Sequence, residues 1–378
     1  MKNKNALVLV IVLAASLFAA CGGGGLMNSP SSAGKANTGG DQKFTWRLAS
    51  VWGNGTPQYL WDVRYCDIVR SLSQGRLDIT PYGVGQLAQV SEVFDLVANG
   101  TVEAGADAAQ YWSGKNTAFD LLGVNVMGMS GIDYFIWTYA SDGLDQYQGL
   151  FAKYGLKYFP TSISTMESGL RSTSKISSLN ELKGKKVRMS GLIVSKLLQE
   201  LGVTPVSMTL SEATDGLSKG VIDAFEYSSP YADESMQIYE IAKFWLAPGF
   251  HQTAAPYGVF FNMKSFDSLP DDLKEIAAIA AKAVSTESLS AFIYRDALAT
   301  QNMVQKYGVT ITRLSNEELL RLERIKNKIY EQLAAENPDF AKIAKSQMDY
   351  FKNITYYQTQ FLGEFSYSRL PKEYPNLK

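Results

Sequence analysis

Two kinds of apolar spacing alternate along the chain from residue 44 onward. Short apolar runs bounded by glycine or polar residues, such as 44–51 and 185–189, have the length and composition of buried strands. Stretches such as 58–73 and 192–201 repeat their apolar residues every three or four positions, which is typical of helices with one buried face. Because the two patterns follow one another repeatedly, the sequence predicts an α/β fold with helices on both faces of a sheet.

A second strand and helix series begins near Tyr158, and after a strand at 258–262 the pattern is almost wholly helical to Leu370. The other predicted elements are strands at 76–82, 101–108, 204–208 and 221–226, a helix at 90–99, and a helix at 211–218 capped by Ser211. The stretch 339–370 carries an apolar, aromatic-rich stripe at mostly three- and four-residue spacings, which needs a surface to cover. Its members are Phe340, Ile343, Met348, Phe351, Ile354, Tyr357, Phe361 and Phe365.

The first residues indicate export and are set aside from the fold. Two lysines precede an apolar run at 6–20 that is too short to span a bilayer comfortably, so residues 1–20 are interpreted as a signal peptide. The run ends in Leu-Phe-Ala-Ala-Cys, which resembles a bacterial lipobox and predicts lipidation of Cys21; ordinary secretion with cleavage near Ala20 is the alternative. Residues 21–42 are dominated by Gly, Ser and Asn, a composition that predicts a flexible tether.

Charge and cysteine content narrow the class of protein. The net charge is −1 with interspersed signs, which disfavours a nucleic-acid-binding protein or a basic membrane patch. The body, about 340 residues long, is sufficient for two α/β domains. The chain has two cysteines, so if Cys21 is lipidated then Cys66 has no partner and no disulfide is expected. Cys66 lies in a helical apolar pattern and is predicted to be a small buried side chain.

Catalytic motifs are weak in this sequence. His251 is the only histidine, which excludes a histidine-dependent triad or a two-histidine metal site within one chain. Neither a glycine-rich phosphate loop nor a Gly-x-Ser-x-Gly elbow is present. Residues 172–175 match the short Ser-x-x-Lys pattern of penicillin-recognising enzymes without its companion motifs. An enzyme is therefore the less favoured hypothesis.

Six fragments together carry a family resemblance that covers most of the chain from about residue 44 to 370. The body resembles the TRAP transporter solute-binding family of the DctP type, and within it the TakP-like branch that binds 2-oxo and 2-hydroxy monocarboxylates. The fragments, in chain order, are 44–50 (FTWRLAS), 99–105 (NGTVEAG), 111–115 (YWSGK), 182–191 (LKGKKVRMSG), 220–227 (GVIDAFEY) and 247–250 (APGF).

The resemblance implies a two-lobed periplasmic binding protein fold of type II-like architecture, with a long connecting helix and a helical C-terminal tail. Lobe I is expected at 43–163 plus about 255–290, lobe II at 164–254 plus about 291–338, and the tail at 339–378. The ligand is expected in the crevice between the lobes, at loops that follow the carboxyl ends of strands.

Arg188 is the predicted carboxylate-binding residue. It ends the strand 185–189 just before a helix start, so its head is expected at the crevice end of the sheet. Only arginine offers a planar fork of donors that does not lose its proton, which suits a buried carboxylate. The family's carboxylate-binding arginine occupies the matching position, and Arg171 resembles a second family arginine whose part varies between ligand contact and support of the lobe interface.

Glu226 is the last residue of the predicted strand 221–226 and Tyr227 follows it. A carboxylate at this place in a closing cleft has to be paired or bound to a cation. The resemblance implies that the Glu226 side chain and the Tyr227 carbonyl hold a Na⁺ or Ca²⁺ ion that bridges to the substrate, and it implies no organic cofactor. The branch usually has Trp at the position of Tyr227 and Gln where this chain offers Ser164 or Thr165 as the third ligand. Without a metal, Glu226 could instead pair with Arg188 or accept a hydrogen bond from a substrate amine or hydroxyl.

Aromatic residues at strand ends and in loops are expected to shape the pocket, whereas others sit inside apolar runs and are expected in the core. The expected pocket residues are Trp52, Tyr111, Trp112, Tyr227 and Phe250, and the expected core residues are Trp61, Trp137 and Phe244.

The resemblance also implies how the protein works and assembles. It predicts an extracytoplasmic lipoprotein that captures a small 2-oxo or 2-hydroxy monocarboxylate, delivers it to TRAP membrane permease subunits and binds no nucleic acid. The tail resembles a helix exchanged between protomers, which predicts a homodimer; packing on its own lobe is the alternative. An amino acid or a bulkier or aryl carboxylate as ligand, and a sensory role without transport, are the other readings.

Overall fold

The structure, a computed structural model, describes residues 42–124 and 126–362. The predicted signal peptide, Cys21, most of the predicted tether and the end of the predicted tail lie outside the described residues. The strands are β1 (Phe44–Ser50), β2 (Leu77–Tyr82), β3 (Ala104–Asp107), β4 (Leu156–Ile163), β5 (Leu170–Ser172), β6 (Lys186–Arg188), β7 (Thr204–Val206), β8 (Ala224–Phe225), β9 (Phe244–Ala247), β10 (Pro256–Asn262) and β11 (Thr310–Arg313).

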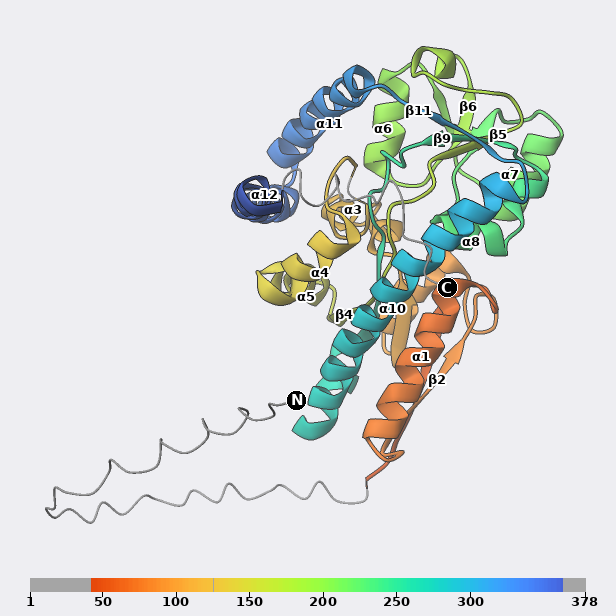
Figure 1. The fold of residues 1–378 in the computed structure, drawn as a ribbon. Coiled ribbons are helices and arrows are strands. Elements are labelled where there is room, and N and C mark those ends of the chain that lie inside the picture. The colour runs from red at the N-terminus through yellow and green to blue at the C-terminus, as the bar shows by residue number, and fades with distance from the viewer. Residues whose placement is uncertain (1–41, 125, 363–378) are drawn as a thin grey trace, which may run out of the picture. The chain divides into compact units, whose positions relative to one another are not determined.

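Helices alternate with strands along much of the chain, as the sequence predicts, but β4 and β5, and β9 and β10, follow one another without a helix between them (Figure 1). The helices are α1 (Pro57–Leu72), α2 (Val93–Ala98), α3 (Ala118–Gly123), α4 (Gly131–Ala140), α5 (Gly143–Ala152), α6 (Leu192–Glu200), α7 (Leu210–Ser218), α8 (Pro230–Ser235), α9 (Met263–Asp267), α10 (Asp271–Gln305), α11 (Asn316–Glu336) and α12 (Pro338–Tyr357). Short 3₁₀ turns lie at Val90–Glu92, Ala109–Trp112, Asn180–Leu182 and Ile238–Glu240, and a π-helical turn lies at Gln358–Leu362.

The strands form two separate mixed sheets. The first has the order β2-β1-β3-β10-β4, in which β10 runs antiparallel to both of its neighbours. The second has the order β11-β9-β5-β8-β6-β7. Because β10 returns at 256–262 to a sheet otherwise built from 44–163, the chain leaves the first sheet after β4 and comes back after β9. The predicted α/β fold is confirmed.

The core of the first sheet follows from the spacing in α1. Thr56 caps this helix and Pro57 occupies its first turn, where a missing N–H costs nothing. Tyr65, Cys66 and Val69 recur at helical spacing and are buried with strand residues such as Ile79. Burial raises the pKa of the Cys66 thiol well above its usual value, so the predicted small buried side chain is confirmed and the thiol is not a reactive nucleophile.

Helix α10 contacts both β4 of the first sheet and α8, the helix that follows β8 of the second sheet. It is long and apolar enough to cross a membrane by composition, but its buried positions pack on β4, α1 and α8 as a core helix does (Figure 1). At its middle the Ser288 hydroxyl accepts a hydrogen bond of 3.1 Å from the Ile163 N–H in β4. Further along, Asp296 accepts one of 2.7 Å from the Tyr231 N–H in α8 and another from the Thr165 hydroxyl.

Helix α12 packs on its own chain in the described structure. Phe340 and Ile343 are buried, and the Ser346 hydroxyl accepts from the indole of Trp137 at 2.9 Å. Trp137 is fully buried, which confirms its predicted place in the core. Met348 is 53% exposed, so the predicted apolar stripe covers a surface only in part of the helix. Trp61 and Phe244 are half-buried.

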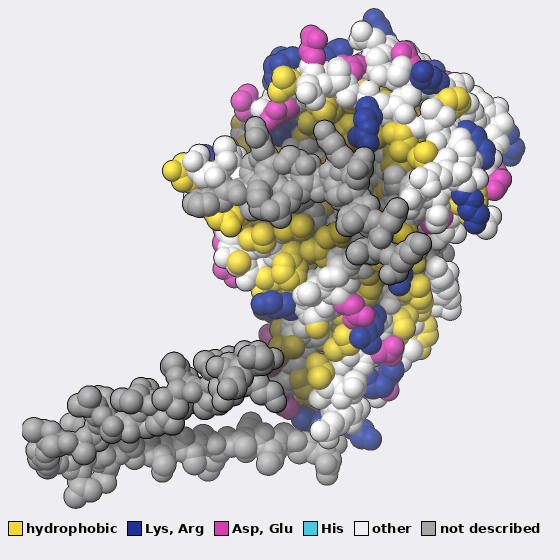
Figure 2. Space-filling view, in the orientation of Figure 1, with side chains coloured by type: hydrophobic (Ala, Val, Ile, Leu, Met, Phe, Trp, Pro, Cys, Tyr) yellow, Lys and Arg dark blue, Asp and Glu magenta, His cyan; other side chains and the backbone are white. Residues whose placement is uncertain are grey.

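Two local predictions were wrong. Thr209, not Ser211, caps α7, because the Thr209 hydroxyl accepts from the Glu212 N–H while the Glu212 carboxylate accepts from the Thr209 N–H. The strand predicted at 221–226 is reduced to β8 because 221–223 form a turn. The described chain after β10 is almost wholly helical, as predicted, and the short strand β11 adds to the edge of the second sheet beside β9. On the face shown in Figure 2, side chains of both signs are interspersed, as the small net charge suggests.

Candidate functional site

Arg188 and Glu226 lie side by side at one edge of the second sheet. Strands β6 and β8 are parallel neighbours with Arg188 opposite Phe225, so the residues that follow them emerge together at their carboxyl ends. Arg188 Nη1 donates to the Glu226 side chain (Oε1) at 2.7 Å and to the Glu226 carbonyl at 2.6 Å. Arg188 Nε donates to the Met208 carbonyl at 3.0 Å, and the Ser190 N–H donates to Glu226 Oε1 at 3.0 Å.

These bonds leave part of the guanidinium unused. Within the described residues, Arg188 Nη2 makes no hydrogen bond, and the side chain is 15% exposed. The predicted bidentate fork is therefore half engaged by Glu226, while Nη2 is available to a ligand. The pairing of Arg188 with Glu226 is the arrangement that the sequence left open for a site without metal.

Two loops bring Glu167 and His251 to the same place. The turn after β9 approaches the backbone of Glu167 so closely that a Cβ on Gly249 would lie 2.0 Å from the Glu167 carbonyl oxygen. The Glu167 N–H also donates to the Gln252 carbonyl at 3.1 Å. The two loops are thereby fixed to each other, because only glycine permits that approach.

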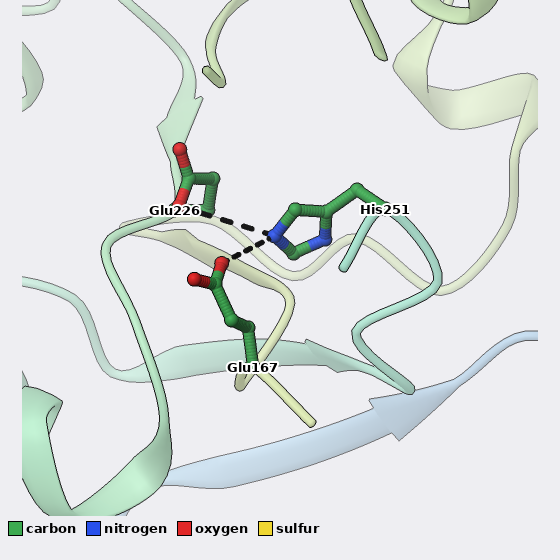
Figure 3. A group of neighbouring side chains, drawn as sticks. All are labelled: Glu167, Glu226 and His251. Atoms are coloured by element: carbon green, nitrogen blue, oxygen red, sulfur yellow. Dashed lines mark hydrogen bonds and ion pairs between the residues drawn. The ribbon is translucent and has the colours of Figure 1, made fainter. Parts of the chain in front are cut away.

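Figure 3 shows the His251 ring with one nitrogen directed toward both carboxylates. Its Nε2 lies 2.8 Å from Glu167 Oε2 and 3.9 Å from Glu226 Oε2. All three side chains are buried, and one ligand atom of each lies within 4.8 Å of the others. The three residues come from three different loops, after β4, β8 and β9.

A cavity of about 50 Å³ adjoins this cluster. Trp52 Nε1, Gln58 Oε1 and Gln110 Oε1 are buried in its wall without a hydrogen-bond partner among the described residues. The lining residues are Trp52, Gln58, Gln110, Tyr111, Glu167, Arg188, Ser190, Tyr227, Gln252 and Tyr257.

The aromatic predictions divide into two groups. Trp52, Tyr111 and Tyr227 line the cavity, and the Trp52 ring contacts Tyr111 with centroids 5.7 Å apart. Trp112 and Phe250 do not line it and belong to the buried core. Trp112 donates its indole N–H to Asp107, and Phe250 is fully buried, so the structure corrects the expectation that these two shape the pocket.

Arg171 and Thr165 also lie elsewhere than the cavity wall. Arg171 is fully buried and donates to Asp233 Oδ2 at 2.8 Å, with its guanidinium 4.2 Å from the centre of the Trp245 ring. This placement favours structural support over ligand contact. The Thr165 hydroxyl donates a hydrogen bond to Asp296, which does not favour Thr165 as the third metal ligand.

Sequence reasoning did not identify several residues of the site. Glu167, Gln58, Gln110, Ser190, Gln252 and Tyr257 all line the cavity. For Glu167 the available signal was its position in the loop between β4 and β5, two residues after Thr165. His251 was noted only because it is the single histidine.

The cluster carries more negative than positive charge when its carboxylates are ionised. Burial raises the pKa of Glu167 to about 8 and that of Glu226 to about 7, and burial lowers the pKa of His251. Arg188 is the one cationic side chain that contacts the cluster among the described residues. A buried acidic set of this kind fits a bound cation, and its carboxylate oxygens are the ligand atoms that Na⁺ and Ca²⁺ prefer.

Comparison with known proteins gives consistent matches. A family model described as "Bacterial extracellular solute-binding protein, family 7" (DctP) matches residues 48–337. A monocarboxylate 2-oxoacid-binding periplasmic protein of Nostoc sp. is 26% identical over 311 residues, which cover 82% of this chain and 84% of that protein.

Two solved structures are similar along most of the chain. One is a TRAP periplasmic solute-binding protein from Pseudoalteromonas atlantica with bound sodium and pyruvate, 25% identical with a TM-score of 0.80, covering 86% of this chain and 99% of that one. The other is a TRAP periplasmic solute-binding protein from Colwellia psychrerythraea with bound calcium and pyruvate, 26% identical with a TM-score of 0.81 and the same coverage.

Proposed function

Because the chain belongs to bacterial extracellular solute-binding protein family 7, we propose that it binds a small 2-oxo or 2-hydroxy monocarboxylate and delivers it to the permease of a TRAP-type importer. The observation that carries this proposal is the placement of Arg188 Nη2 beside a small cavity next to a buried carboxylate cluster. The protein acts by binding and release, without catalysing a reaction.

The cavity suits a short carboxylate. An anion in a buried site needs a donor that stays charged, and the free terminal nitrogen of Arg188 provides one, with aromatic walls on the side of Trp52 and Tyr111. The unpaired Trp52 Nε1 supplies a further donor to an acceptor on the ligand.

We further propose that a cation lies beside the ligand, held by the Glu226 carboxylate and the Tyr227 carbonyl. A 2-oxo or 2-hydroxy acid presents two adjacent oxygens, which chelate a hard cation, and the two solved relatives named above hold sodium or calcium together with pyruvate. When bound, the ion would offset the charge of the buried carboxylates and of the ligand.

Thermal denaturation of the mature protein tests the proposal. We expect pyruvate and lactate to raise the melting temperature, because a ligand at 100 times its Kd stabilises the folded state by about 2.7 kcal/mol. The shift should shrink in sodium-free buffer with a chelator. Acetate has the carboxylate but no oxygen on its second carbon, and it serves as the matched control.

A specific alternative comes from Glu167, an acidic residue that lines the same cavity as the basic Arg188. A free α-amine could pair with Glu167, which would make an amino acid the ligand. Stabilisation by alanine but not by lactate, unchanged by chelator, would reject the 2-oxo acid proposal in favour of this one.

We also propose that Cys21 carries the lipid anchor and that the protein forms a homodimer through its C-terminal tail. The lipobox resemblance supports the first part, and the exposed Met348 at the middle of α12 and Tyr356 and Tyr357 at its end support the second. Cys21→Ser should move the protein expressed with its own leader from the membrane fraction to the soluble fraction. An unchanged distribution between the fractions contradicts the anchor.

The released protein should scatter light as a dimer at about 10 µM. A folded monomer at this concentration contradicts the dimer.

A further inference from the structure

We propose that Glu167 is a second carboxylate ligand of the cation site and makes that site selective for a divalent cation over Na⁺. The inference rests on the proposed function and specifies the ion that accompanies the ligand. It concerns a residue that the family resemblance did not point to, since the resemblance placed the third ligand at Thr165.

The geometry places both carboxylates around one point. A ligand atom of Glu167, one of Glu226 and one of His251 lie within 4.8 Å of one another. Oxygens that bind one Ca²⁺ ion lie about 2.3–2.6 Å from it, so ligands on opposite sides are at most about 5 Å apart. Glu226 Oε1 is held by Arg188 and the Ser190 N–H, whereas Oε2 faces His251 and Glu167. The observed spacing therefore matches a shared ion.

The balance of charge points to a divalent ion. Carboxylates bind a cation in their ionised form, so in the loaded site Glu167 and Glu226 each contribute one negative charge and Arg188 one positive charge, while the nearby Asp233 is already paired with Arg171. A bound monocarboxylate adds a further negative charge, so two negative charges are left unbalanced. A divalent cation balances both, but Na⁺ leaves one buried charge without compensation, which is costly in a water-excluded site. Calcium sites are tuned by the number of charged ligands in this way.

His251 is better explained as a positioning residue than as a metal ligand. A proton on Nε2 lets the ring donate to Glu167 Oε2 at 2.8 Å, whereas a lone pair there would face a carboxylate oxygen. A histidine that binds metal usually donates its other ring N–H to a partner, and His251 Nδ1 has none among the described residues. The cluster is therefore an oxygen site, which suits Ca²⁺ better than Zn²⁺.

The backbone gives Glu167 little freedom to leave this position. Its carbonyl oxygen lies against Gly249, and its N–H is bonded to the Gln252 carbonyl. The neighbouring Ser168 N–H donates to the Ser228 carbonyl at 2.9 Å, so the loop of Glu167 is also bonded to the loop after Glu226. The side chain is thus directed to the cluster before any ion binds.

Calorimetric titration of ligand-free protein with CaCl₂ and with NaCl tests the proposal. Glu167→Gln keeps the shape and removes the charge, and we expect it to weaken Ca²⁺ binding at least about tenfold while changing Na⁺ binding much less. Glu331→Gln, at an exposed position on α11, is the control and should leave both affinities unchanged. Melting curves of each variant establish that it is folded.

The outcomes separate this proposal from the proposed function. Calcium affinity in Glu167→Gln equal to that of the unchanged protein would overturn the role of Glu167, even if pyruvate binds. Calcium binding that depends on Glu167 in a protein that pyruvate fails to stabilise would leave the inference standing and reject the proposed ligand. His251→Gln separates positioning from ligation: a loss of only a few-fold in Ca²⁺ affinity supports positioning, whereas loss of binding equal to that in Glu226→Gln would make His251 a ligand and contradict the oxygen site.

Discussion

Replacing Arg188 with alanine is expected to lower the affinity for pyruvate by about 30- to 150-fold, because a charge-assisted contact to a buried carboxylate is worth about 2–3 kcal/mol. Arg188 is also the partner of Glu226, so its removal leaves the buried Glu226 carboxylate without its arginine partner. Lysine at this position should also bind weakly, since a single ammonium group cannot contact the Glu226 side chain, the Met208 carbonyl and the ligand together.

Isothermal titration with pyruvate measures this effect, and circular dichroism reports the fold. The double variant Arg188→Ala with Glu226→Gln removes both charges and restores charge balance, which separates loss of binding from loss of folding. If Arg188→Ala and Arg188→Lys both bind pyruvate with near-normal affinity, the carboxylate partner lies elsewhere in the cavity.

Asp233→Ala is expected to reduce the free energy of unfolding by about 3–5 kcal/mol, because removing one member of a buried ion pair leaves the other uncompensated. Both Arg171 and Asp233 are fully buried, and their side chains are 2.8 Å apart. Arg171 also contacts Trp245 in β9 and Met303 in α10, so the pair joins β5 and α8 to the long helix.

Urea unfolding followed by fluorescence measures the change. Asp215→Ala disrupts the exposed pair with Lys219, whose side chains are more than 70% exposed, and should cost less than about 1 kcal/mol. Arg171→Met keeps much of the packing, and a folded Arg171→Met variant should bind pyruvate normally if Arg171 is structural. Near-wild-type stability of Asp233→Ala would refute the structural role of the pair.

The regular part of the fold was predictable because each element has a local cause. The period of apolar residues predicts β1, α1, β6 and α6 to within about one residue at each end. Arg188 and Glu226 could both be located for a related reason: each follows a recognisable strand, and ends of parallel strands meet at one edge. Their proximity thus follows from short-range patterns and one rule of topology.

The remainder of the site depends on contacts between loops distant in sequence. Glu167 and His251 are 84 residues apart and meet because the turn at Gly249 packs on the Glu167 backbone. No local pattern encodes that approach. Trp112 and Phe250 also could not be placed from local patterns. Their loop positions suggested that they line the pocket, whereas the fold buries both in the core.

Helix α10 contains neither glycine nor proline between Asp271 and Gln305, so it has no built-in site at which to kink. It is bonded to β4 through Ser288 and to α8 through Asp296, whose carboxylate also holds the loop of Thr165 next to Glu167. A change in angle between the two sheets consequently has to curve this rod or break the bonds at Asp296. Any opening or closing motion of the two sheets would therefore strain the bonds of a carboxylate that does not line the cavity.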